Sequence, residues 1–338
     1  MKFSTYFKDW LYGQDGYYTQ YRTIGKGGDF YTAVSTSKFF GGAIAQKAIQ
    51  TIQSGFLPSN TAIVEVGAHH GYLLADMIEF IYTLQPQLLD TLTFAIVERF
   101  PHLQEQQKKY FKDSFGDAVK LVHYNDISEI KLDSALIVAN EIFDAFEAEL
   151  IYTTQDGVRK NVVVNEHQLT FEPCSDSFLN ALCDKYGIRQ GEIALGYEIF
   201  AQTLAHNIKK FEFITFDYGE KYPRNDFSIR IYHKHKVFPL FQEELKLDEL
   251  FGKSDLTYDV NFMHLIDSFN EAKIKNVSYQ TQLKALVEFG IIELLEILKE
   301  KAGESVYLRE VQKVKTLLEP TGMGDRFKVA VFRKEPHA

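Results

Sequence analysis

The sequence predicts an α/β fold whose core is a doubly wound, mainly parallel β-sheet. In the segment 61–77, a nearly continuous apolar run ends in an acidic residue and a glycine turn and then leads into a helix. Such an apolar run is typical of a parallel strand that is covered on both faces. Gly67 and Gly71 lack a Cβ, as a sharp turn or a closely approaching ligand requires. Strands and helices alternate from residue 61 onward, which is the pattern of an α/β sheet.

Length and composition limit the classes of protein to be considered. The chain has 338 residues, of which 45% are hydrophobic, so it can bury one large core or two modest ones. Its net charge of −9 argues against nucleic-acid binding, which usually requires a basic surface. Cys174 and Cys183 form no C-x-x-C pair and no disulfide framework, so we expect a reducing, cytoplasmic location. No apolar run approaches the roughly 18 residues of a membrane span, and none is expected.

The first half of the chain is predicted to contain an N-terminal arm and most of the sheet. Residues 1–55 form the arm, with irregular short helical pieces over 2–30 and a helix over 35–53 that Ser35 or Thr36 could cap. The core sheet is assigned to 56–147 and 211–219. The predicted strands are 61–66, 92–97, 119–122, 135–139 and 212–217, and the predicted helices between them are 71–84 and 100–113.

The remaining segments are predicted to be insertions into a single domain that spans 1–338. Residues 148–210 and 220–320 form the insertions, and 327–333 form the last strand. Within the insertions, the sequence predicts a β-hairpin over 148–172 and helices over 195–210 and 279–302. We find no internal repeat and no long linker.

The glycine turn and the polar residues after later strands predict the cofactor. A dinucleotide-binding turn requires G-x-G-x-x-G, and the spacing Gly67-x-x-x-Gly71 counts against a nicotinamide oxidoreductase. Class I methyltransferases use an acidic strand end and a looser glycine turn, so S-adenosylmethionine is the expected cofactor. Glu98 follows the next strand and is placed to bind the ribose hydroxyls, although a solvated strand end is the alternative. Asp126 is placed to meet the adenine amine. The expected cofactor-binding residues are Glu65, Gly67, His69, Gly71, Glu98 and Asp126.

An acidic segment follows the fourth predicted strand. Asn140, Glu141 and Asp144 supply an amide and two carboxylates at the position where this fold holds the methyl-donating sulfonium. The alternative is a helix N-terminus rich in acidic residues, which the helix dipole favours. We assign these three residues as the expected catalytic group.

These motifs resemble those of the MidA-like methyltransferases, a family that includes a mitochondrial complex I assembly methyltransferase. The matching segments cover nearly the whole chain and occur in the order 28–32, 40–41, 64–71, 140–144, 217–219, 235–236, 255–262, 281–282 and 323–328. The chain also departs from the family pattern. Ala68, His69 and His70 replace the usual P-G-R inside the glycine turn, and Val34 and Ser35 stand where the family has proline and glutamate. The side chain of His69 narrows the turn where the amino-acid end of the cofactor would lie. Ser35 lacks the carboxylate that could hold the acceptor or the amino group of the cofactor.

The resemblance implies that a methyl group passes from S-adenosylmethionine to an arginine of a partner protein, expected to be a respiratory complex I subunit. Glu141 and Asp144 would hold the guanidinium by bidentate bonds, and Asn140 would orient it. Asp217 and Tyr218 would line the other wall, although Asp217 could instead be a turn residue before Gly219. The main alternative is a non-catalytic assembly factor that binds the cofactor. A methyltransferase for small molecules is a further alternative.

Three other features of the sequence are assigned no chemical role. His233 and His235 form an H-x-H pair without a metal-binding motif, so no metal site is expected. We expect Arg230 to be a surface charge, and the alternative is a residue that steers an acidic group of the substrate. The segment 255–262 has no mechanism that follows from its residues, and its importance rests on the family resemblance.

Overall fold

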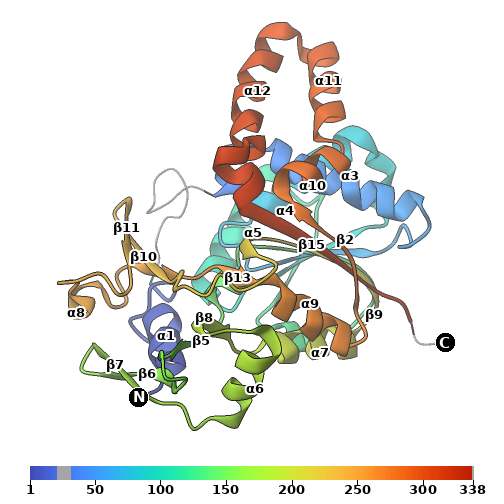
Figure 1. Cartoon of the computed structure of the whole chain (residues 1–338). Helices are drawn as coiled ribbons and strands as arrows, with labels where there is room; N and C mark the ends of the chain where they lie inside the picture. Colours follow the sequence, from blue (N-terminus) through green and yellow to red (C-terminus); the bar gives the residue numbers. More distant parts are fainter. Residues whose placement is uncertain (21–31, 337–338) are drawn as a thin grey trace. The chain divides into compact units, whose positions relative to one another are not determined.

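The computed structural model describes residues 1–20 and 32–336, and the contacts among them divide the chain into two compact units. The core unit comprises 32–142, 200–217 and 269–336. The insertion unit comprises 1–20, 143–199 and 218–268. Figure 1 shows the elements of both units coloured along the sequence. The early motif at 28–31 and its neighbouring glycines lie outside the described residues, so the arm is described only up to residue 20.

The core unit contains a seven-stranded path of strands in the order β14-β15-β9-β4-β1-β2-β3. The strands from β9 to β3 pair in parallel, whereas β14 and β15 are antiparallel. The order changes direction at β1, which confirms the predicted doubly wound sheet. The bounds are β1 Ala62–Val66, β2 Thr93–Val97, β3 Leu121–Tyr124, β4 Leu132–Asn140, β9 Ile208–Glu220, β14 Lys275–Thr281 and β15 Phe327–Lys334.

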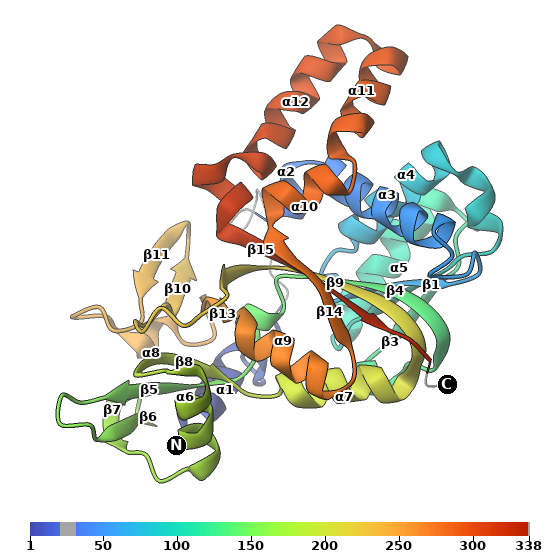
Figure 2. The same cartoon turned by 45° about the vertical axis from the view of Figure 1, so that its right-hand side comes forward.

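Apolar helices and strands build the hydrophobic core of this unit. Ile63 of β1 and Val138 of β4 are fully buried, as strands covered on both faces should be. The Phe40 ring meets the edge of the Phe216 ring with 4.8 Å between centroids. In both views, α11 and α12 lie side by side as an antiparallel pair (Figures 1 and 2). The helices are α2 Ala33–Thr36, α3 Phe39–Gln53, α4 Tyr72–Leu84, α5 Pro101–Phe115, α10 Gln282–Glu288, α11 Ile291–Ala302 and α12 Glu304–Leu318.

The insertion unit contains two small antiparallel sheets. One has the strand order β7-β6-β5-β8 and the other β11-β10-β12. The chain passes from one unit to the other between Ile142 and Phe143 and also within three elements, α7 Tyr197–Asn207, β9 and α9 Phe262–Glu271. The remaining elements are α1 Phe3–Tyr12, β5 Ala148–Thr153, β6 Arg159–Asn165, β7 Gln168–Pro173, α6 Ser177–Tyr186, β8 Gln190–Ala194, β10 Arg230–His233, β11 Lys236–Pro239, α8 Leu247–Leu250, β12 Asp255–Thr257 and β13 Val260–Asn261.

Several predicted helices have different bounds in the structure. The helix predicted over 279–302 begins as the end of β14 and is then broken at Gly290, whose φ of +98° ends one helix before α11 starts. The helix predicted over 35–53 is two helices. Thr32 caps α2, and the Ser37 hydroxyl accepts the Phe39 N–H at 3.2 Å, so the prediction that Ser35 or Thr36 caps the longer helix was wrong. The prediction of a single domain stays a prediction, because compactness alone does not test independent folding.

The sequence analysis also missed elements. The helices α6, α9 and α12 were not predicted, and the N-terminal arm begins with the ten-residue helix α1 rather than irregular short pieces. These helices are amphipathic, so their helical periodicity could have predicted them. Of the helices in the described parts of the chain, none is long and apolar enough to cross a membrane.

Candidate cofactor and acceptor site

The glycine turn after β1 requires unusual backbone conformations. Gly67 and Gly71 have φ values of +72° and +77°, and His69 between them has a φ of +46°. A Cβ on Gly67 would lie only 2.9 Å from Cγ2 of Ile142, so a side chain does not fit there. The left-handed region favours glycine because it has no Cβ. The turn therefore brings the backbone of the core unit close to whatever occupies the end of β1.

Glu65 is buried inside β1 and connects this strand to the following helix. Its Oε2 accepts the backbone N–H of Leu74 at 3.1 Å. Burial raises the pKa of Glu65 to about 8, because a charged carboxylate loses its hydration there. The carboxyl group thus fixes the first turn of α4 against the strand. Its predicted role in binding the cofactor stays a prediction.

Helix α5 contacts the histidine-containing turn through the side chain of Gln107. The carbonyl oxygen of His69 accepts the Nε2–H of Gln107 at 2.7 Å. The rings of His69 and His70 meet edge to face with 4.0 Å between centroids, and burial lowers the pKa of His70. Gln107 is fully buried, and its Oε1 lies 2.9 Å from Nε2 of His123. The altered turn is therefore an ordered structure, in which Gln107 takes part although sequence reasoning did not single it out.

Glu98 lies at the carboxyl end of β2, next to the glycine turn. The Gly67 N–H donates to the carbonyl of Val97 at 3.0 Å, which places Glu98 directly after the residue that holds the turn. The Glu98 side chain is buried, and its Oε1 accepts the N–H of Phe100 at 3.1 Å. Burial raises its pKa to about 7. The alternative of a solvated strand end was therefore wrong, whereas the ribose assignment stays a prediction.

Asp126 has a local structural role. Its Oδ1 accepts the N–H of Ser128 at 2.9 Å and caps a short 3-10 helix, Ile127–Glu129. The neighbouring Asn125 bonds to the carboxylate of Glu129. The polar side chains that follow β3 thus have hydrogen-bond partners within the protein itself. The predicted contact of Asp126 with the adenine stays a prediction.

Three of the predicted polar residues lie where the pairing of β4 with β9 ends. The strands pair in parallel, and Asn140 lies opposite Phe216. The Glu141 N–H donates to the Phe216 carbonyl at 2.8 Å, and Asp217, the next residue, is fully buried. Asn140 donates from Nδ2 to Oε1 of Glu141 at 3.0 Å. The core unit therefore carries two carboxylates and an amide at the point where β4 and β9 stop pairing.

One atom of this group has an unused hydrogen-bonding capacity. Oδ1 of Asn140 is buried, and no donor among the described residues reaches it. Glu141 has a left-handed backbone, with a φ of +54°. A buried acceptor without a donor costs free energy, typically about 1–3 kcal/mol. This atom is therefore available to a donor group on a ligand.

Asp144 and Tyr218 lie in the insertion unit and interact with each other. The Tyr218 hydroxyl donates to Oδ2 of Asp144, and both side chains are buried. Burial raises the pKa of Asp144 to about 6, although the bond from Tyr218 and the charge of Arg230 lower it. The guanidinium of Arg230 lies 5.2 Å from the centre of the Tyr218 ring. Arg230 thus belongs to the immediate surroundings of a predicted site residue.

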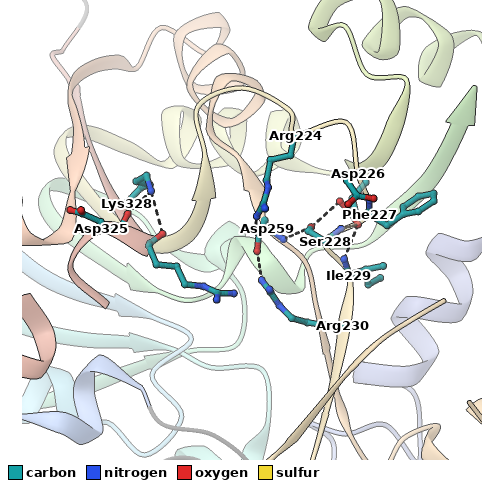
Figure 3. A network of polar contacts seen from close by, with 11 residues as sticks. Arg224, Asp226, Phe227, Ser228, Ile229, Arg230, Asp259, Asp325 and Lys328 are labelled. Carbon is teal, nitrogen blue, oxygen red and sulfur yellow. Dashed lines mark hydrogen bonds and ion pairs between the residues drawn. The ribbon is translucent and has the colours of Figure 1, made fainter. Parts of the chain in front are cut away.

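Arg230 is also half of a shielded ion pair, which Figure 3 shows. Its Nη2 donates to Oδ1 of Asp259, and Nη1 of Arg224 donates to Oδ2 of the same carboxylate at 3.1 Å. The side chains of Arg230 and Asp259 are only 17% and 11% exposed. The interpretation of Arg230 as a surface charge was therefore wrong. Its partner Asp259 lies 29 residues away in sequence, so the pairing has no local signal.

The structure gives the segment 255–262 a positioning role. The Tyr258 N–H donates to the Asp144 carbonyl at 3.2 Å, and Val260 pairs with Gly219 in β9. A Cβ on Gly219 would overlap the Val260 backbone, so only glycine permits this pairing. Oδ1 of Asn261 accepts the backbone N–H groups that begin α9. The segment therefore holds Asp144 and Tyr218 in place.

The H-x-H pair belongs to a hairpin turn. Lys234 and His235 have φ values of +50° and +63°, the pattern of the two-residue turn that joins β10 and β11. Nδ1 of His233 lies 3.2 Å from the Lys253 carbonyl oxygen. A search of residues 1–20 and 32–336 finds no cluster of three His, Cys, Asp or Glu side chains that could hold a metal ion.

The predicted site residues are divided between the two units. Those in the core unit are Glu65, Gly67, His69, Gly71, Glu98, Asp126, Asn140, Glu141 and Asp217. Asp144 and Tyr218 are in the insertion unit.

Comparisons with known proteins decide the family. Residues 43–280 match the family described as "Putative S-adenosyl-L-methionine-dependent methyltransferase". The chain belongs to this family. It is a MidA-like methyltransferase, and S-adenosylmethionine is its cofactor, as the sequence predicted.

Curated relatives and solved structures extend this result. A protein of Danio rerio, named "Protein arginine methyltransferase NDUFAF7, mitochondrial", is 24% identical over 92% of this chain and 78% of its own length. The Mus musculus protein of the same name is 25% identical over 92% of this chain and 76% of its own length. A crystal structure from Burkholderia thailandensis, described as a likely methyl transferase bound to S-adenosyl-homocysteine, covers 100% of this chain and 89% of its own. Its TM-score of 0.83 at 21% identity confirms the predicted fold.

The residues of the core unit fit the cofactor. Gly67 leaves the backbone accessible, and Glu98 supplies a buried carboxylate at the strand end where ribose hydroxyls need an acceptor. Asn140 supplies a buried acceptor that lacks a donor, which the ammonium group of a bound S-adenosylmethionine could provide. These three features are at the carboxyl ends of β1, β2 and β4, where doubly wound sheets bind ligands.

Proposed function

We propose that this methyltransferase transfers a methyl group to an arginine side chain of a partner protein. The observation that carries the proposal is that Glu141 and Asp217 directly follow Asn140 and Phe216, the last residues at which β4 and β9 pair. A guanidinium group presents its N–H donors in a planar fork, which two carboxylates can bind from different sides. The names of the zebrafish and mouse relatives, which are protein arginine methyltransferases, support the same acceptor.

The chemistry is an in-line displacement, in which positioning supplies most of the rate enhancement. S-adenosylmethionine supplies an electrophilic methyl group on its sulfonium sulfur. Glu141 and Asp217 would hold two nitrogens of the guanidinium and leave the third free to attack. Asn140 would keep Glu141 oriented through the 3.0 Å bond from its Nδ2. The carboxylates would also receive the proton that the attacking nitrogen must lose after it is methylated.

Burial strengthens these interactions. Asp217 is fully buried, so its carboxylate is poorly hydrated and interacts strongly with an incoming cation. A guanidinium remains protonated because its pKa lies above 12, and the site therefore binds a cation rather than a neutral nitrogen. The predicted roles of Asp144 as a catalytic carboxylate and of Tyr218 as an acceptor contact stay predictions.

The partner is proposed to be a protein, and a respiratory complex I subunit is the specific candidate that the family resemblance implies. A cytoplasmic location follows only from the cysteine content and stays a prediction. The alternative of a non-catalytic assembly factor is not favoured, because the chain belongs to a methyltransferase family and retains Glu98, Asn140 and Glu141.

The test combines labelling with binding. The purified protein is incubated with S-adenosylmethionine carrying a labelled methyl group and with recombinant complex I subunits, and methylated residues are located by mass spectrometry. We expect label on an arginine, and loss of the label in Glu141→Gln. A protein that binds S-adenosylhomocysteine but labels no subunit and no extract protein would contradict the proposal. Label on a small molecule alone would favour the small-molecule alternative.

A further inference from the structure

The insertion unit contains a cavity that the methyl-transfer proposal does not use. Its volume is about 380 Å³, and it is lined by Tyr152, Lys160, Phe171, Gln190, Phe227 and Phe241. This volume lies near the lower limit of the range that ligand sites in proteins occupy. Five of the six side chains carry an aromatic ring or an amide, and the sixth is a lysine. The cavity is therefore apolar, with one positive charge in its wall.

The aromatic rings form a connected wall. Phe171 and Phe241 are stacked with 5.7 Å between centroids, and Phe227 packs against Phe241 at 4.6 Å. Tyr152 meets Phe171 edge to face at 5.7 Å. The Phe171 side chain remains 36% exposed although it is surrounded by other rings. Rings that line an open cavity provide a large contact area for another apolar side chain, with little loss of conformational entropy.

The β-sheet places the polar wall residues in a row. Lys160 of β6 pairs with Tyr152 of β5, which pairs with Gln190 of β8. Gln190 donates from Nε2 to Oδ1 of Asp226 at 3.1 Å, and the same oxygen accepts the Phe227 N–H at 2.8 Å. The Asp226 carboxylate is thus engaged within the wall. In contrast, the side chain of Lys160 makes no hydrogen bond or ion pair within the described part of the chain, although its charge interacts with that of the exposed Asp156.

Strand β7, which carries Phe171, is the edge of its sheet. It pairs with β6 on one side, and β6 and β5 continue the sheet away from it (Figure 2). Half of the backbone N–H and C=O groups of such an edge strand point outward and can pair with an added strand. Pro173 ends the strand and limits this pairing to the preceding residues. In an added strand, alternate side chains would point to the face on which Phe171 lies.

We propose that this cavity and the β7 edge bind an extended peptide segment in which acidic residues flank a large apolar side chain at alternate positions. The apolar side chain would enter the cavity between Phe171, Phe227 and Phe241, and a carboxylate would meet Lys160. The positive charge of Lys160, which no ion pair within the described part of the chain neutralises, favours an acidic segment over a basic one or a cationic ligand. This mode of recognition combines backbone pairing with one side-chain pocket. It concerns binding alone and does not depend on the transferred methyl group.

The test uses capped heptapeptides that contain no arginine, in the absence of a methyl donor, so its failure leaves the proposed function unaffected. The acidic probe is acetyl-Thr-Glu-Thr-Phe-Thr-Glu-Thr-amide with a fluorescent label, and the basic probe has lysine in place of glutamate. We expect the wild type to bind the acidic probe about threefold or more tightly than the basic one. Lys160→Glu should reverse this preference, which a folding defect could not do. Phe241→Ala should weaken binding of both probes by about tenfold.

Two controls make the result specific. Lys301→Glu changes the same charge on an exposed residue of α11 and should leave the preference unchanged. S-adenosylhomocysteine affinity should be equal in all variants. The proposal is overturned if neither probe binds at millimolar concentration, or if Lys160→Glu keeps the preference for the acidic probe. It is also overturned if N-acetylphenylalanine binds as tightly as the acidic probe, because the cavity would then be a small-molecule site.

Discussion

The backbone N–H of Glu141 donates to the carbonyl of Phe216 at 2.8 Å, which joins the end of β4 to β9. Phe216 is also the last residue of β9 that pairs with β4, opposite Asn140. The bond turns the chain after Asn140 into a left-handed conformation at Glu141 and fixes where its side chain starts. The positions of Glu141 and Asp217, the carboxylates proposed to bind the guanidinium, therefore depend on the backbone geometry where β4 and β9 stop pairing.

Replacement of the acceptor carboxylates should impair transfer far more than cofactor binding. For Glu141→Gln and for Asp217→Asn, we expect methyl transfer to fall by about tenfold to a hundredfold, because each removes a charge-assisted hydrogen bond of about 1.5–3 kcal/mol. The affinity for S-adenosylhomocysteine should change less than threefold. Asp133→Asn, an exposed carboxylate of β4 paired with Lys209, is the matched control. Equal losses of binding and transfer would instead place these carboxylates at the cofactor.

Glu98 should make cofactor affinity depend on pH. Its pKa is raised to about 7, so the carboxylate is charged at pH 8 and largely protonated at pH 6. If it accepts the ribose hydroxyls, the affinity for S-adenosylhomocysteine should fall as the pH decreases from 8 to 6. Glu98→Gln should bind more weakly at pH 8 and should lose the part of the pH dependence that this carboxylate causes. Titration calorimetry at both pH values measures the affinity for S-adenosylhomocysteine. Identical pH profiles for the wild type and Glu98→Gln would contradict the assignment of Glu98 to the ribose.

His69→Gly should tighten cofactor binding. The position has a φ of +46°, which glycine adopts with less strain, and the change removes a ring from the glycine turn. Glu166→Gly, at a φ of +47° in the hairpin turn between β6 and β7, is a control for relief of strain without a change at the cofactor turn. Both variants should unfold at equal or higher temperature than the wild type. Weaker binding by His69→Gly would indicate that the imidazole itself contacts the cofactor.

Asp259→Asn should destabilise the insertion unit. It leaves the shielded guanidinium of Arg230 without its main counter-charge, and breaking a buried pair in this way costs about 3–5 kcal/mol. Because Arg230 retains some exposure, we expect roughly 2–3 kcal/mol, measured by urea unfolding. The double variant Asp259→Asn with Arg230→Met should recover part of the loss, since no buried charge remains. A free energy of unfolding equal to that of the wild type would show that the pair has no structural role.

Glu65→Gln should stabilise the protein at alkaline pH. The pKa of Glu65 is about 8 in the folded chain and near 4.5 when unfolded, so the folded state binds more protons between these values. The contribution to stability is complete below the unfolded pKa and is lost as the pH rises through 8. Urea unfolding at pH 5 and pH 9 should show a loss for the wild type that exceeds that of Glu65→Gln by about 3 kcal/mol. Parallel pH profiles would contradict burial of this carboxylate.

Local sequence patterns predicted the strands of the large sheet except β14 and β13, and the motifs predicted the family. Strand β1 and its turn could be predicted from the apolar run that includes Ile63 and Val64 and from the glycines at 67 and 71. An apolar run indicates a buried strand, and glycine permits the backbone conformations of a tight turn, so both signals depend on residue type alone. The polar residues after each strand, such as Glu98 and Asn140, could be placed at one edge because parallel strands end on the same side. The family resemblance then supplied the cofactor and the reaction class.

The tertiary structure decided what depends on contacts between distant segments. Glu98 is buried rather than solvated, and Gln104 and Gln107 of α5 hydrogen-bond to it, which no pattern around Glu98 indicates. Arg230 pairs with Asp259, 29 positions away, and Asp144 with Tyr218, 74 positions away. The residues around a charged position do not indicate a partner at such a distance in the sequence. Local propensity determines strands and turns, whereas the desolvation and partner of a charged group are properties of the folded chain alone.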